Sequence, residues 1–202
     1  MKRFRLLVLL LILTNVVISQ TTYTNLSKET TITEQLPIRA VRKSAIWFNM
    51  GWNGFVGIGP AISSYATPKI AIDAGLGLSS TGFKLSGRGR YLFSVKNFTP
   101  FVGAGFQYGL GSRTDFELKD GFNNNEPFRV KIFPSPFLQL AGGFEYMAKK
   151  GFFVLFNVGY AILLKDENYT ITKGSPSPDE LKALDISYRS GIVFEGGIGY
   201  AF

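Results

Sequence analysis

Charged residues recur at alternate positions within apolar stretches of this chain. In an extended stretch successive side chains point to opposite faces, so these charges share one face and the apolar residues between them share the other. Six residues stand out in this way: Asp73, Lys84, Arg88, Arg90, Glu145 and Glu195. Enclosed charges persist only when they are paired and hydrogen-bonded. We therefore predict a network of enclosed ion pairs, and the alternative is a path for protons or ions.

Asp73 has the most specific expected partners. The stretches that hold Asp73 and the two arginines are separated by Thr81-Gly82, which suits a hairpin turn. A register that keeps both charged faces on the same side of the sheet places Asp73 opposite Arg88 or Arg90.

Other chemistry is poorly supported. The chain has no His and no Cys, so the usual nitrogen and sulfur ligands of metals are missing, as are disulfides and a lipidated N-terminus. No spacing marks a Ser/Lys or carboxylate pair as catalytic. We expect no catalytic site, no metal and no cofactor.

The alternation predicts an all-β fold made of one domain. Its clearest example is the stretch 100–111, where Val102, Ala104 and Phe106 alternate with Gly103 and Gly105. After the N-terminus no apolar run approaches the roughly 18 residues of a membrane-spanning helix. Eight strands are expected, at 45–52, 54–64, 69–79, 83–94, 100–111, 135–147, 152–164 and 189–202.

The N-terminus is typical of an exported protein. Residues 1–19 combine a basic start, an apolar centre and small residues before a cleavage site between Ser19 and Gln20. An uncleaved membrane anchor is the alternative. Residues 20–43 are polar and Thr-rich and predict a flexible periplasmic tail, and residues 44–202 are expected to form the domain of eight strands. Without the three basic residues of the signal the net charge falls from +8 to +5, which gives no support to nucleic-acid binding.

The lengths of the connections alternate along the chain. The two long connections, 112–134 and 165–188, follow the fifth and seventh strands, whereas those after the second, fourth and sixth strands are tight. Outer-membrane barrels have short turns on the periplasmic side and long loops outside. Leu181, Leu184 and Ile186 in the second long connection form either a short helix or a continuation of the last strand.

The last strand carries a more particular pattern. Glu195, Gly197, Tyr200 and Phe202 resemble the C-terminal assembly signal of bacterial outer-membrane barrels. With the strand count, they make residues 45–202 similar to the small eight-stranded barrels, namely the OmpA transmembrane domain and its OmpX-like and OmpW-like relatives. A soluble barrel also alternates, but Gly on the polar face suits a cramped interior, and Tyr and Phe near strand ends suit membrane interfaces.

The resemblance implies a transmembrane, antiparallel up-and-down β-barrel in the bacterial outer membrane. We expect a monomer with a sealed polar lumen and a structural or surface-interaction role. Its expected partners are outer-membrane lipid, the barrel assembly machinery, and a surface ligand or protein at 112–134 and 165–188. Two alternatives are a narrow channel for small or apolar solutes and an accessory protein of an assembly or secretion system.

Overall fold

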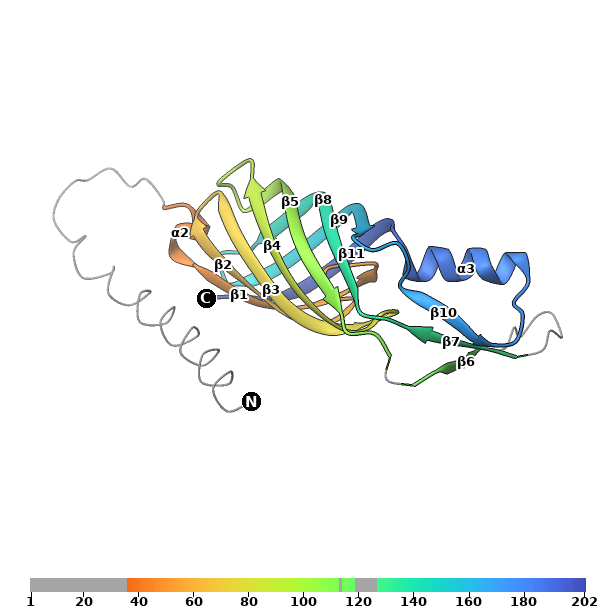
Figure 1. The fold of residues 1–202 in the computed structure, drawn as a ribbon. Helices are drawn as coiled ribbons and strands as arrows, with labels where there is room; N and C mark the ends of the chain where they lie inside the picture. The colour runs from red at the N-terminus through yellow and green to blue at the C-terminus, as the bar shows by residue number, and fades with distance from the viewer. Residues whose placement is uncertain (1–35, 113, 119–126) are drawn as a thin grey trace, which may run out of the picture. The chain divides into compact units, whose positions relative to one another are not determined.

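The computed structural model describes residues 36–112, 114–118 and 127–202. Eight antiparallel strands form a closed barrel in the order β1-β11-β9-β8-β5-β4-β3-β2 (Figure 1). The strands are β1 (Ser44–Trp52), β2 (Ile58–Thr67), β3 (Ile70–Ser79), β4 (Gly82–Leu92), β5 (Phe98–Gly109), β8 (Ser135–Met147), β9 (Phe152–Leu163) and β11 (Gly191–Ala201). The predicted fold class, a closed eight-stranded antiparallel barrel, is confirmed. The expected signal peptide 1–19, with Ser19 and Gln20, lies outside the described residues.

The barrel has its apolar side chains on the outside. Along β1, Trp47 is buried while Ile46 and Phe48 on either side are about half exposed. The same alternation of buried and exposed positions runs along the other strands of the barrel. Consecutive barrel strands pair with each other, and β11 pairs with β1 to close the sheet, which leaves no free edge in the barrel.

Aromatic rings pack beside the charges in the interior. The ring of Trp47 stacks on Phe55 at a centroid distance of 6.3 Å and lies 6.0 Å from Phe153. Gly197 makes room for Trp47, because a Cβ at residue 197 would lie 2.4 Å from Cε3 of the indole. The interior therefore combines ring packing with buried charge.

The structure corrects the predicted second strand, 54–64. Residues 53–57, between β1 and β2, turn into the barrel, and Phe55 and Val56 are fully buried there. Asn53 and Gly57 have positive φ angles of 48° and 75°, which turn the backbone inward and back out. Phe55 and Val56 are apolar and common in strands, so the sequence of this stretch does not distinguish it from a strand.

The described end of the N-terminal tail also differs from the flexible segment we expected. Residues Ile38–Val41 form the one-turn helix α2. Arg39 is buried, and Arg42 Nη1 donates to the Ala201 carbonyl oxygen over 2.6 Å. Arg39 and Arg42 have carboxylate and carbonyl acceptors within reach, and these hydrogen bonds offset the entropy lost when the segment becomes ordered.

The two long connections fold together rather than standing as separate loops. Strands β6 (Phe116–Leu118), β7 (Phe128–Ile132) and β10 (Tyr169–Lys173) form a three-stranded sheet beyond one end of the barrel, beside helix α3 (Pro178–Tyr188) (Figure 1). We call β6, β7, β10 and α3 the cap. Phe128, Val130, Ile132 and Leu184 form its apolar core.

Helix α3 settles the alternatives for the second long connection. Ser177 and Glu180 form a capping box at its start, with Pro178 in the first turn. Tyr169 of β10 donates to Asp185 of α3 over 2.7 Å, and burial together with this bond raises the pKa of Tyr169 to about 12.

In the described ranges no helix has the length and apolar character needed to cross a membrane.

Candidate functional site

The site is the interior of the barrel, where the alternation of β3, β4, β8 and β11 collects charged side chains. The structure places all six charged residues singled out from the sequence in the interior, each at most 3% exposed. In a narrow barrel the inward side chains of opposite strands point toward one another, so long side chains from different strands meet at the centre.

Asp73 is held between two arginines. The register places it directly opposite Arg88, with Arg90 one inward position further along β4. Its Oδ2 accepts from Nε of Arg88 over 3.0 Å and from Nε of Arg90 over 2.7 Å. Its Oδ1 accepts from Nη2 of Arg90 over 2.9 Å and from the Ser63 hydroxyl over 2.8 Å. Both oxygens of the carboxylate are therefore occupied by donors.

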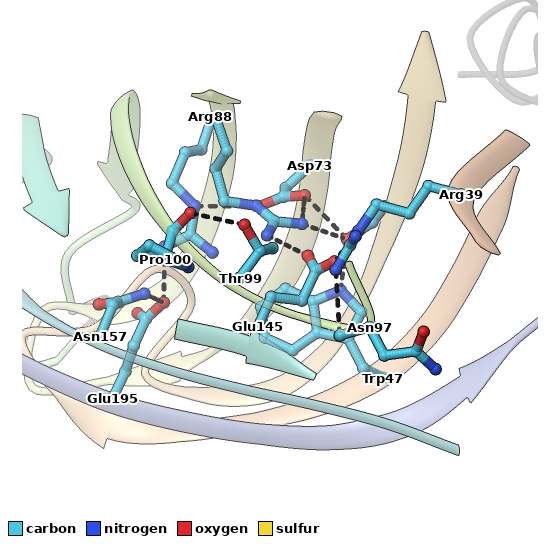
Figure 2. Close-up of polar contacts among 12 residues, drawn as sticks. Arg39, Trp47, Asp73, Arg88, Asn97, Thr99, Pro100, Glu145, Asn157 and Glu195 are labelled. Atoms are coloured by element: carbon cyan, nitrogen blue, oxygen red, sulfur yellow. Dashed lines mark hydrogen bonds and ion pairs between the residues drawn. The ribbon is translucent and has the colours of Figure 1, made fainter. Parts of the chain in front are cut away.

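The pairs continue from this carboxylate in one direction to Glu145. Arg90 Nη1 lies 2.5 Å from Oε2 of Glu145, and the other oxygen of Glu145 accepts from Nε of Arg39 over 2.6 Å. Arg39 also donates to the carbonyl oxygens of Lys96 and Asn97, in the turn between β4 and β5. Helix α2 thus inserts a guanidinium into the barrel (Figure 2), at the end that carries the C-terminus (Figure 1).

In the other direction the pairs reach Glu195. Its Oε1 accepts from Nη1 of Arg88 and from Nδ2 of Asn157, each over 2.6 Å. Its Oε2 accepts from the backbone N–H of Phe55, in the segment that turns inward. The Phe55 ring lies under the guanidinium of Arg88, 4.6 Å from centroid to Cζ, in a cation–π contact.

We refer to these residues as the ion-pair network: Arg39, Asp73, Arg88, Arg90, Glu145 and Glu195. Figure 2 shows it as a continuous chain of contacts from Glu195 to Arg39. All six carboxylate oxygens in it accept at least one hydrogen bond. Because each of these oxygens is already engaged by a positively charged, hydroxyl or amide donor, the arrangement favours a fixed structure over a path for protons or ions.

Lys84 stands apart from the network. Its Nζ donates to Oε1 of Gln107 over 3.2 Å and to the Gly54 carbonyl oxygen over 3.3 Å, and it lies 5.5 Å from the centroid of the Phe137 ring. Among the described residues it forms no ion pair within 4.0 Å.

Sequence reasoning missed Arg39 and Phe55 as members of the site. The three acids and three bases singled out from the sequence already balance, so charge alone gave no reason to look for a fourth base in the tail. The available signal was position, because Arg39 lies only five residues before β1 and can reach the mouth of the barrel. For Phe55 the Asn53-Gly54 dipeptide indicated a turn but not its direction.

The residues of the proposed assembly signal do not gather in one place. Glu195 belongs to the ion-pair network, Gly197 lies against Trp47, and Tyr200 and Phe202 are about half exposed on the outside. Phe202 completes the closure of the barrel, since its N–H donates to the Ser44 carbonyl over 2.8 Å and its carbonyl accepts from the Ser44 N–H over 3.1 Å.

Metal ligands do not cluster in the described ranges, where no group of three or more His, Cys, Asp or Glu residues is placed to hold an ion.

No family model matches the chain. No curated protein matches it either. Among solved structures, the chain is similar to the N-terminal β-barrel domain of Pseudomonas aeruginosa OprF, with a TM-score of 0.46 and 13% sequence identity, over 80% of this chain and 98% of that one.

We predict that the ion-pair network contributes far more stability than ion pairs on the surface. Replacing Asp73 with Ala leaves two buried arginines without this partner, and we expect a loss of about 3–5 kcal/mol in the free energy of unfolding. The matched control is Glu117→Ala, which breaks a half-exposed pair with Arg129 in the cap and should cost about 0–1 kcal/mol. Urea titration of protein refolded in lipid vesicles measures both, and equal losses would refute the network.

Proposed function

We propose that this protein is a bacterial outer-membrane β-barrel with a sealed polar lumen and a structural or surface-interaction role. The observation that carries the proposal is the distribution of side chains in the barrel: charged side chains are buried in the interior, and apolar side chains cover the outer surface. A soluble protein does not expose a continuous apolar band, because apolar surface in water favours association. A lipid bilayer is the solvent that such a band fits.

The dimensions of the barrel support this environment. Its eight strands have 9 to 13 residues, close to the roughly 9–11 residues of a tilted membrane strand. Aromatic side chains lie exposed near strand ends, among them Trp52, Phe98, Tyr146 and Tyr200. Trp and Tyr are enriched where a bilayer meets water.

The connections support one orientation. The cap lies at one end of the barrel, and short turns together with α2 and the C-terminus lie at the other (Figure 1). Outer-membrane barrels carry short turns on the periplasmic side. We therefore place the cap outside the cell, where it is the surface available to a ligand or a protein partner.

The contents of the lumen support a closed barrel. The inward segment 53–57 fills it from the cap end, Arg39 occupies it from the opposite end, and the ion-pair network crosses the space between them. An eight-stranded barrel has room for little more than its own side chains. This arrangement favours a structural role over the alternative of a narrow channel.

Membrane placement predicts an asymmetric response to charge. Leu140, in the middle of β8, and Phe116, in β6 of the cap, are 51% and 49% exposed. Leu140→Arg puts a charge near the centre of the bilayer and should cost about 2–4 kcal/mol in vesicle unfolding experiments. Phe116→Arg has matched exposure outside the barrel and should change little. A soluble barrel would tolerate both changes equally, and that outcome would overturn the proposal.

A sealed lumen predicts an electrically silent protein. In planar lipid bilayers we expect no ion-conducting steps from the wild type. The variant Phe55→Ala/Arg88→Ala removes the ring and the guanidinium that lie against each other at the centre of the lumen, and it should conduct. If the wild type conducts as well as this variant, the protein is a narrow channel instead.

The C-terminal residue is proposed to serve recognition by the barrel assembly machinery. Its side chain is exposed and touches none of the ion-pair network, so the Phe202→Lys variant should lose little stability, about 0–1 kcal/mol for a charge near the interface. The folded amount in the outer membrane, measured by the mobility change on boiling, should nevertheless fall severalfold. Normal folded levels in cells would remove the basis for an assembly signal in this strand.

A further inference from the structure

We infer that the half of the barrel interior nearest the cap binds a small, singly charged anion between Lys84, Gln107 and Gln139. The inference is independent of what the cap binds. It rests on an unbalanced buried charge and on amide groups that lack hydrogen-bond partners.

The buried charges of the described residues do not cancel. Four basic side chains, Arg39, Lys84, Arg88 and Arg90, are buried with three acidic ones, Asp73, Glu145 and Glu195. The three acids are all engaged by the arginines, and none lies within 4.0 Å of the Lys84 ammonium. One positive charge is therefore left over, and it resides on Lys84. A buried charge without a counter-charge is costly.

The contacts that Lys84 does make are with neutral groups. The Gln107 side-chain oxygen, the Gly54 carbonyl oxygen and the face of the Phe137 ring surround its Nζ. These dipoles and the ring quadrupole orient the ammonium and offset part of its desolvation. They do not neutralise its charge, as an anion would.

The neighbouring amides supply further donors. Gln107 and Gln139 are fully buried, and the Nε2 of Gln107 and both side-chain polar atoms of Gln139 have no hydrogen-bond partner in the structure. Orphaned buried polar groups of this kind are rare and each requires an explanation. The Gln107 amide lies against the Lys84 ammonium, and its unpartnered N–H groups together with those of Gln139 form a donor set suited to an anion.

The register brings these donors to adjacent strands. Gln107 of β5 pairs with Ser86 of β4, one inward position from Lys84, and with Phe137 of β8, one inward position from Gln139. The residues paired with Gln139 on its two sides are Gly105 and Ala161, neither of which offers its amide a hydrogen-bonding side chain. The enclosed location limits the ligand to a small ion such as a halide.

A metal cation does not fit this set, because the Lys84 ammonium repels it. A water molecule satisfies the amides but leaves the excess charge in place. A halide satisfies the amide N–H groups and cancels the charge, so it is the ligand that meets both requirements.

Bromide tests the site directly, because its position is visible by anomalous X-ray scattering. Wild-type protein refolded and crystallised in sodium bromide should show an anomalous peak within hydrogen-bond distance of the Lys84 Nζ. Lys84→Met, which keeps most of the length of the side chain and removes its charge, should lose the peak. A wild-type map without density at this place would overturn the inference, whether or not the variant folds.

A solution measurement supplies the second arm. At constant ionic strength, the thermal unfolding midpoint of the wild type in detergent should be higher in sodium chloride than in sodium gluconate, whose anion is too large for the enclosed site. Lys84→Met should show no difference between the two salts, and Gln139→Leu should show a reduced one. The matched control Lys131→Met, in the cap, should keep the wild-type difference. Equal midpoints of the wild type in both salts would contradict binding.

Discussion

The Asp73 carboxylate, held between Arg88 and Arg90, is the interaction on which the rest of the interior depends. It fixes the register of β3 against β4, because a shift of one residue would turn these side chains to the outside. From the two arginines the contacts pass to Glu195 of β11 and Glu145 of β8, and so reach across the barrel. Strands distant in sequence are thereby held by charge as well as by backbone pairing.

Such a network carries a thermodynamic risk, which the barrel limits by giving every carboxylate oxygen a hydrogen-bond donor. Buried ion pairs stabilise a protein only when geometry and additional hydrogen bonds offset the loss of hydration. Here Ser63, Asn157 and the backbone of Phe55 complete the bonding of Asp73 and Glu195. The inward segment 53–57 is therefore part of the electrostatics of the interior and not only a space-filling loop.

Most of the barrel was predictable from the sequence, because strand alternation is a local property with a period of two residues. The inward side of β3, β5 and β8 followed from that period. The hairpin expected at Thr81-Gly82 has Ser80 and Thr81 as its loop in the structure, and this register places Asp73 opposite Arg88. The segment 54–57 was not predictable in the same way. Its Phe55 and Val56 are apolar like strand residues, and only the positive φ angles at Asn53 and Gly57 send it inward.

Contacts between segments far apart in sequence were also beyond the local pattern. Nothing in the composition of residues 20–43 distinguishes Arg39 from Arg42, although one is buried and the other binds carbonyls at the rim. The pairing of β10 with β7 joins two connections that each look like an independent loop in the sequence. Such pairings depend on the closed barrel bringing the ends of β5 and β9 to the same side.

The shared sheet of the cap makes its two long connections depend on each other. Strand β7 comes from one connection and β10 from the other, and Leu184 of α3 packs into the core that β7 supplies. An insertion within either paired strand would break hydrogen bonds made by the other connection. The two segments are thus constrained to diverge together, and an antibody against the folded cap would recognise a composite epitope that neither connection presents as a linear peptide.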